Sequence, residues 1–225
     1  MILLASIYNR NTRFLVVDIE TAKQDNSFIF DIGFGIYSRA DGFLTRQAYI
    51  VKENESKIPF YADRLQRYAD YVDNGDYKVK HFRYIMAVIH NMIDKYKPQF
   101  LTAYNLGFDF STIDKVCNRM KIANPLLQLQ PFDMWQGACE TIGQQKLFKQ
   151  FVDKHDLRKP VTKNRMSGAE TMYRYMTANP HYTEEHTGLG DILIEVEILD
   201  RIIRQKKPLS MKWGNKAQAW RLVQG

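Results

Sequence analysis

A chain of 225 residues can bury one large hydrophobic core or two small ones, and 45% hydrophobic with 13% aromatic residues excludes a disordered protein. No apolar run reaches the ~18 residues that a membrane-spanning helix needs, so we expect no membrane partner. Cys117 and Cys139 form no C-x-x-C motif, and residues 1–8 lack the basic start of a secretory signal, which favours a cytoplasmic protein.

The positive charge of the chain is confined to its end. There are 32 lysines and arginines against 25 acids, a net charge of +7, and residues 201–225 contain seven of the cations and no acid. Trp213 and Trp220 lie among these cations, a mixture that suits phosphates and nucleic-acid bases. The segment predicts a polyanionic partner, although a solvated basic tail without a ligand fits the same composition.

The first half of the chain contains three predicted strands followed by two predicted helices. Runs of apolar and β-branched residues predict the strands, and a turn at Ala40-Asp41-Gly42 joins the second to the third. These strands are residues 14–17, 27–37 and 43–51. The first predicted helix is polar, and apolar residues at three- and four-residue spacing predict the second. These helices are residues 61–72 and 82–96.

The second half of the chain alternates one short predicted strand with helices. The strand is residues 100–104, and the helices are residues 109–120, 144–154, 168–177 and 191–204. Early strands with helices between and after later strands predict an α/β fold, with a mixed central β-sheet flanked by helices. We expect one domain over residues 1–205 and a basic C-terminal tail over residues 206–225.

Two acids follow the first predicted strand in the sequence FLVVDIETAKQDN, residues 14–26. Four apolar residues indicate a strand buried on both faces. Because side chains alternate along a strand, Asp18 and Glu20 point to one side and Ile19 points to the other. Two convergent carboxylates share a cation or, at an exposed strand end, are simply solvated, and this segment alone fits both interpretations.

Two more acids lie at predicted helix starts. Asp109 follows the strand in TAYNLGFDFSTID, and Asp191 begins the apolar helix in EEHTGLGDILIEVEIL, five residues after His186. Each acid also fits a simple role at a helix N-terminus. Four carboxylates at the ends of strands and helices favour Mg²⁺ or Mn²⁺ over zinc. Two such ions ~4 Å apart stabilise phosphoryl displacement, and a histidine supplies a base that titrates near neutral pH.

Three motifs in order carry a resemblance to a known family. D-x-E at 18–20, Y-N-x-x-F-D at 104–109 and H-x-G-x-x-D at 186–191 resemble the signatures of the DEDDh (DnaQ-like) 3′–5′ exonucleases. This family has a ribonuclease H-like fold and includes proofreading subunits, ribonuclease T and oligoribonuclease. Thr187 stands where a sister subgroup has tyrosine, which indicates the histidine branch. The resemblance runs from about residue 12 to residue 204.

The resemblance implies a role for each matching residue. Two divalent cations, Mg²⁺ or Mn²⁺, would be bound by the carboxylates of Asp18, Glu20, Asp109 and Asp191, with Asp18 bridging both. His186 would deprotonate the attacking water. Ile19 and Thr21 would hold the terminal nucleotide, and Asn105 would support the metal ligands or position the substrate.

The function that this resemblance implies is a metal-dependent 3′–5′ exonuclease that acts on single-stranded DNA or RNA and releases nucleoside 5′-monophosphates. The alternative is a catalytically silent nucleic-acid-binding protein or scaffold on the same fold. Cleavage at internal positions is a third interpretation, within the nuclease class. Several members of the family pair as dimers and some serve polymerases, so a homodimer or a polymerase partner is an expectation at the level of the family.

The sequence departs from the family pattern in two places. Ala22-Lys23-Gln24 follows the first motif where members often have Thr and Gly, and Gly188 replaces the usual alanine. We expect Gly188 to loosen the His186 loop. Residues 121–185 are expected to shape the substrate groove.

Several further acids, histidines and tyrosines are expected to have structural roles or to lie at the surface. Asp31 is expected to have a hydrogen-bonded structural role, with a position near the metals as the alternative. His181 is expected at the surface. Asp114 and Asp133 are expected to cap helices or be solvated, and Tyr173 and Tyr175 to pack in a helical core rather than stack on bases.

Overall fold

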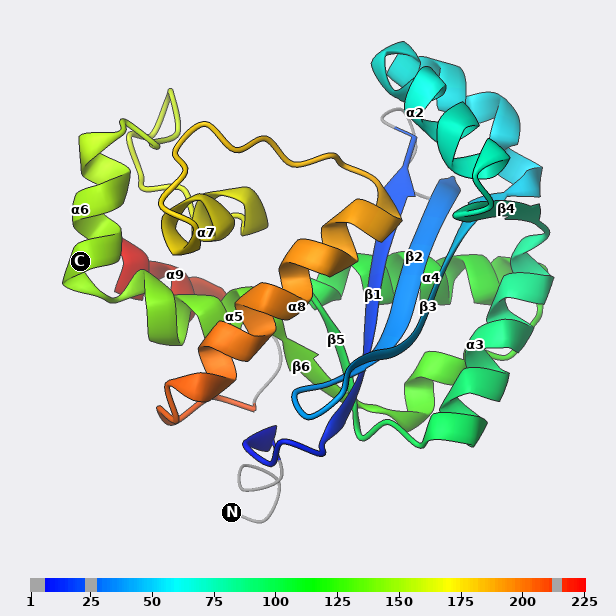
Figure 1. The fold of residues 1–225 in the computed structure, drawn as a ribbon, viewed down its shortest axis with the longest axis horizontal. Helices are drawn as coiled ribbons and strands as arrows, with labels where there is room; N and C mark the ends of the chain where they lie inside the picture. Colours follow the sequence, from blue (N-terminus) through cyan, green and yellow to red (C-terminus); the bar gives the residue numbers. More distant parts are fainter. Residues whose placement is uncertain (1–6, 23–27, 212–215) are drawn as a thin grey trace.

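The computed structural model describes residues 7–22, 28–211 and 216–225 (Figure 1). Within these residues six strands form one sheet in the order β4-β3-β2-β1-β5-β6. Pairing is antiparallel from β1 to β2 and from β2 to β3, and parallel in the other three pairs. The strands are β1 (Arg13–Thr21), β2 (Ile29–Ser38), β3 (Gly42–Val51), β4 (Tyr77–Lys80), β5 (Phe100–Ala103) and β6 (Gln130–Asp133). The predicted mixed sheet is confirmed.

Helices cover both faces of the sheet (Figure 1). On one face lie α3 (Phe82–Tyr96) and α4 (Leu106–Met120), and on the other lies α8 (Gly188–Arg204), which crosses β1 and β2. The remaining α-helices are α2 (Ala62–Asp73), α5 (Met134–Ala138), α6 (Lys146–Lys154), α7 (Ala169–Met176) and α9 (Lys216–Gln224). The described residues also contain two 3₁₀ helices, η1 (Lys52–Tyr61) and η2 (Pro125–Gln128), and one π-helix, η3 (Cys139–Gly143).

The alternation of side chains along β1 divides the protein into two cores. Phe14 and Val16 are fully buried in the core under α8, whereas Leu15 and Val17 are fully buried in the core under α3 and α4. The strand is longer than predicted, because β2 continues the ladder as far as Thr21. Asp18 and Glu20 therefore lie within β1 rather than after it, on the α8 face.

The sequence did not predict β4, β6, α5 or α9. Strands β4 and β6 contain four residues each and form the two edges of the sheet, and β6 contains Pro131, which a central strand would exclude. In the segment expected to be a tail, Leu209, Ala219 and Val223 are buried in the core under α8. Lys212 and Trp213 lie outside the described residues. The described part of the segment is thus packed on the domain.

The N-terminus of α8 makes the closest contact with the sheet. A Cβ atom on Gly188 would lie 2.4 Å from the backbone nitrogen of Gly33, and one on Gly33 would lie 2.0 Å from the carbonyl oxygen of Gly188. The expectation that Gly188 loosens the His186 loop is therefore wrong. Glycine at both positions lets the helix start rest directly on β2.

Asp31 stabilises the contact between the start of α8 and β2 through hydrogen bonds. Its side chain is fully buried, and its Oδ2 atom accepts hydrogen bonds from the Gly188 amide at 2.8 Å, the Tyr68 hydroxyl at 2.7 Å and the Tyr77 hydroxyl at 3.0 Å. The Tyr77 hydroxyl also accepts a bond from the Leu189 amide at 2.9 Å. The predicted hydrogen-bonded structural role of Asp31 is confirmed.

None of the helices in the described part of the chain combines the length and the apolar character of a membrane span.

We expect Gly188→Ala to lower the free energy of unfolding by at least ~1–3 kcal/mol, because backbone atoms of β2 occupy the space that the new methyl group needs. Chemical denaturation measures this effect. Gly168→Ala is the matched control, since a Cβ there would meet no atom within 4 Å, and we expect its effect to stay below ~1 kcal/mol. Equal stability of the two variants would contradict the tight contact.

Candidate metal centre

The C-terminal half of β1 extends beyond its partner β5. Their pairing ends at Val16 and Thr102, so the β5 side of β1 is open from there on. Asp109, in the first turn of α4, fills this side: its Oδ1 accepts the Ile19 amide at 3.2 Å, and the residue is 3% exposed. Asn105 begins α4 in the left-handed conformation, which asparagine tolerates. Asp109 is thus held against β1 beside Asp18 and Glu20.

The start of α8 positions His186 and Asp191, after the residues of β1 and α4. Thr187 caps the helix by accepting the Gly190 amide at 3.1 Å, and Asp191 follows in the first turn, 6% exposed. His186 precedes the cap with a φ of 52°. Its side chain is 49% exposed, and its Nδ1 lies 3.8 Å from an Oε2 atom of Glu184. The imidazole is therefore open to solvent, whereas the carboxylate of Asp191 is shielded.

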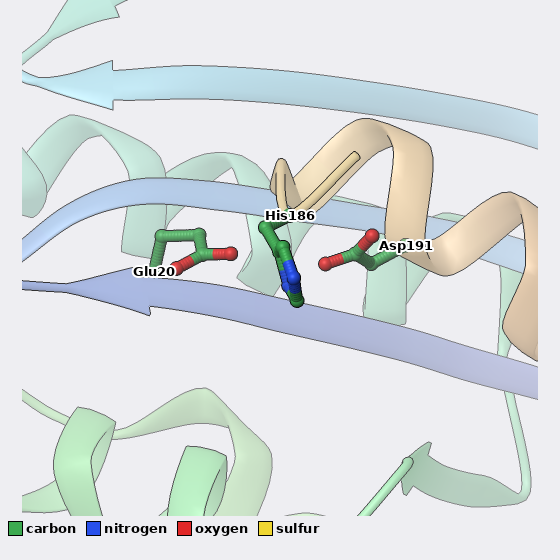
Figure 2. Close-up of side chains that lie close together, drawn as sticks. All are labelled: Glu20, His186 and Asp191. Atoms are coloured by element: carbon green, nitrogen blue, oxygen red, sulfur yellow. The ribbon is translucent and has the colours of Figure 1, made fainter. Parts of the chain in front are cut away.

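The structure brings three of the predicted residues close enough together to hold one ion, and Asp18 and Asp109 lie within electrostatic reach of them. Ligand atoms of Glu20, His186 and Asp191 lie within 4.8 Å of one another, and Figure 2 shows the imidazole between the two carboxylates. Asp18 interacts electrostatically with Asp191, Asp109 and Glu20. A second group, Glu170, Glu184 and His186, has ligand atoms equally close. That these residues bind metal stays a prediction.

The electrostatics of the cluster favour a cation. Burial, followed by repulsion from Asp191, Glu195, Asp109 and Glu20, raises the pKa of Asp18 well above its ordinary value. Burial also raises the pKa of Asp109, against the lowering effect of its hydrogen bonds with backbone amides. The Oδ2 atom of Asp18 is shielded from solvent and has no hydrogen-bond partner among the described residues. An unsatisfied oxygen among like charges fits a hard divalent cation.

A fifth acid, Glu195, was missed in the sequence. It lies one turn after Asp191 on α8, is 2% exposed, and is repelled by Asp109 and Asp191. The spacing of four residues places it on the same helix face as Asp191. The available signal was an acid within the apolar run ILIEVEIL, but Glu197, two residues further on, is exposed, so the run alone does not distinguish them.

The residues expected to bind substrate differ in their accessibility. Ile19 is 5% exposed and belongs to the core under α3 and α4, and Thr21 is 9% exposed, so their role in holding a nucleotide stays a prediction. Asn105 is exposed, and with Tyr104, Trp135 and Gly168 it lines a pocket of about 280 Å³.

Two hydrogen bonds to one residue fix the aromatic walls of this pocket. The Trp135 indole donates to the Ser167 hydroxyl at 3.1 Å, and the Tyr104 hydroxyl donates to the Ser167 carbonyl at 2.6 Å. Trp135 and Gly168 come from residues 121–185, the segment expected to shape a groove.

The residues for which no functional role is expected lie at the surface, bond to nearby polar groups or pack against aromatic rings. His181 is exposed, as expected. Asp133 caps α5 by accepting the Gln136 amide, and Asp114 accepts hydrogen bonds from Asn118 and Asn124. Tyr175 packs edge-on against Phe148 and Phe151, and Tyr173 contacts the ring of Tyr182.

This chain is similar to known proteins in its fold rather than in its sequence. No protein-family model and no curated protein sequence matches the chain. Its fold is similar to that of E. coli exonuclease I, solved in complex with a 5cy-dA13 oligonucleotide, with a TM-score of 0.50 and 13% sequence identity. The match covers 86% of this chain and 42% of that one. The expected ribonuclease H-like fold, a mixed sheet flanked by helices, is therefore confirmed.

The raised pKa values predict how stability depends on pH. A carboxyl whose pKa is raised by folding contributes stability that is fully present below its unfolded pKa of ~4 and is lost as the pH rises through its folded pKa. In a chelator, we expect Asp18→Asn to be more stable than the wild type near neutral pH, with the difference shrinking toward pH ~4. Thermal unfolding across this range measures it, and a difference independent of pH would contradict the proposed repulsion.

Proposed function

We propose that this protein is a metal-dependent 3′–5′ exonuclease of the DEDDh type that acts on single-stranded nucleic acid. One observation carries the proposal: acids from β1, α4 and α8 converge with an accessible imidazole at the end of a central strand. These residues come from three motifs spread over 174 positions, from Asp18 to Asp191, and burial of the acids destabilises them unless a cation is shared.

The donor set fits divalent cations of the hard type. Two Mg²⁺ or Mn²⁺ ions, held by Asp18, Glu20, Asp109 and Asp191, would stabilise the charge that develops on the phosphate oxygens. The similarity to an exonuclease solved with an oligonucleotide is consistent with this assignment.

His186 acts as the general base in the proposed reaction. It accepts a proton from the water whose oxygen attacks the terminal phosphodiester phosphorus. The bond from phosphorus to the 3′ oxygen of the preceding nucleotide breaks, that oxygen takes a proton from solvent, and a nucleoside 5′-monophosphate leaves. Because His186 is half exposed, its proton can pass to bulk water between turnovers. Glu184 lies beside this imidazole, with its Oε2 atom 3.8 Å from Nδ1.

The pocket beside Asn105 suits the base of a nucleotide. Tyr104, one of its walls, donates its amide to Glu195 and so adjoins the acid cluster. Trp135 offers an aromatic face held in place by Ser167, and stacking on such a face is tolerant of base identity. A compact pocket next to the acids supports removal of one terminal nucleotide at a time.

We expect Asp18→Asn and Asp191→Asn to abolish release of mononucleotides from a 5′-labelled oligonucleotide in Mg²⁺, and His186→Ala to slow it ~10²–10⁴-fold through loss of the base. His181→Ala is the matched control, because this histidine is exposed five residues away and should leave the rate unchanged. Circular dichroism checks the fold of each variant.

The same assay separates the alternatives. Binding of the oligonucleotide by the wild type without shortening would favour the catalytically silent protein. Cutting of a circular single strand would favour cleavage at internal positions.

The basic C-terminal segment supports a longer substrate. Lys206 and Arg221 are exposed, whereas Lys207 donates to the Thr141 carbonyl. The end of α8 lies 13 residues after Asp191, which is about 20 Å along the helix. Lys206, just past the end of α8, is therefore remote from the acids and could contact only the upstream part of a strand.

We expect Lys206→Glu with Arg221→Glu to weaken binding of a long single strand and to reduce the slope of log K against log salt, by roughly 0.7 for each lost phosphate contact. A dinucleotide should bind equally well to both proteins, which serves as the control. Charge reversal is a better test than deletion of the segment, because deletion would remove Leu209, Ala219 and Val223 from the core. An unchanged slope would mean that the segment is a solvated basic surface that does not contact the strand.

A further inference from the structure

Glu195 is a buried acid in an apolar helix. It is 2% exposed and stands between Ile194 and Val196, both of which are also buried. Leaving an ionised carboxylate in such surroundings is strongly unfavourable unless it is paired or coordinates a cation. Apolar residues fill the neighbouring positions, so the acid at this one calls for a physical explanation.

One oxygen of Glu195 has a structural partner. Its Oε1 accepts the Tyr104 amide at 3.0 Å. Tyr104 directly follows β5 and directly precedes Asn105, which begins α4. Through this bond α8 is joined to the segment that presents Asp109.

The second carboxylate oxygen of Glu195 has no hydrogen-bond partner among the described residues. The Oε2 atom of Glu195 is shielded from solvent and makes no hydrogen bond with the described residues. Its strongest electrostatic partners are Asp109, Asp191 and Glu184, all of the same sign, and Glu195 in turn repels Asp18. Glu195 and Asp18 are thus repelled by the same two acids, Asp109 and Asp191, and each has one buried oxygen without a hydrogen bond among the described residues.

We propose that Glu195 is a fifth carboxylate of the metal centre, whose Oε2 atom helps to hold a divalent cation while Oε1 anchors Tyr104. The inference rests on the proposed function, since it concerns the cation that the other four acids would bind. It explains both oxygens of Glu195: one is satisfied by a backbone amide, and the other by a cation shared with Asp18, Asp109 and Asp191.

Glu195→Gln tests this role. Glutamine keeps the volume and can still accept the Tyr104 amide, but it removes the charge. We expect binding of Mn²⁺ to the full chain, measured by calorimetry or electron paramagnetic resonance without nucleic acid, to weaken ~10–100-fold. The rise in melting temperature on adding Mn²⁺ should shrink, while the chelated variant should be at least as stable as the wild type.

Two further variants sharpen the result. Glu197→Gln, on the same helix but exposed, should bind Mn²⁺ like the wild type. Glu195→Met fills the site without charge, so that a folded variant is available if glutamine is not accommodated. Wild-type Mn²⁺ affinity in either folded Glu195 variant would overturn the proposal and leave Glu195 as a protonated anchor for Tyr104.

Failure of this inference differs from failure of the proposed function. If the wild type binds Mn²⁺ and loses affinity in Glu195→Gln but hydrolyses no oligonucleotide, the fifth carboxylate stands and the exonuclease does not. If the wild type hydrolyses and Glu195→Gln retains Mn²⁺ affinity, only the role of Glu195 fails.

Discussion

The contact between Gly33 and Gly188 determines where the candidate metal centre can form. Two glycines allow α8 to begin directly on β2, and the buried carboxylate of Asp31 holds the helix there through the Gly188 amide. His186 and Asp191 flank this point, so the same contact places an imidazole and a carboxylate over the end of β1. A side chain at either glycine would lift the helix start and separate the α8 acids from Asp18 and Glu20.

The second determinant is the alternation of side chains along β1. Its apolar residues pack alternately into the two cores, and the same alternation places Asp18 and Glu20 on the α8 face. Acids at the end of such a strand lose solvation and repel one another. The folded protein therefore carries an unfavourable site that a cation would relieve, a compromise typical of functional sites.

The similarity to E. coli exonuclease I at 13% identity concerns the fold. Folds of this kind carry their function in a few side chains rather than in the bulk of the sequence. In this chain Glu20, His186 and Asp191 have ligand atoms within 4.8 Å of one another, and Asp18, Asp109 and Glu195 repel one another beside them. Two of the residues that line the pocket beside Asn105, Trp135 and Gly168, come from a segment that contains none of the three motifs.

The central strands, the longer helices and four of the buried or half-buried acids could be predicted from the sequence, because periodicity and motif spacing depend on neighbouring residues. The edge strands β4 and β6, the packing of α9, the need for glycine at position 188 and the burial of Glu195 could not be predicted, because they depend on contacts between distant segments. A short edge strand forms only where a distant strand pairs with it. Glycine is needed at position 188 only because the backbone of β2 lies against it. Desolvation and repulsion likewise depend on atoms far apart in the chain, which meet only once the two cores have formed.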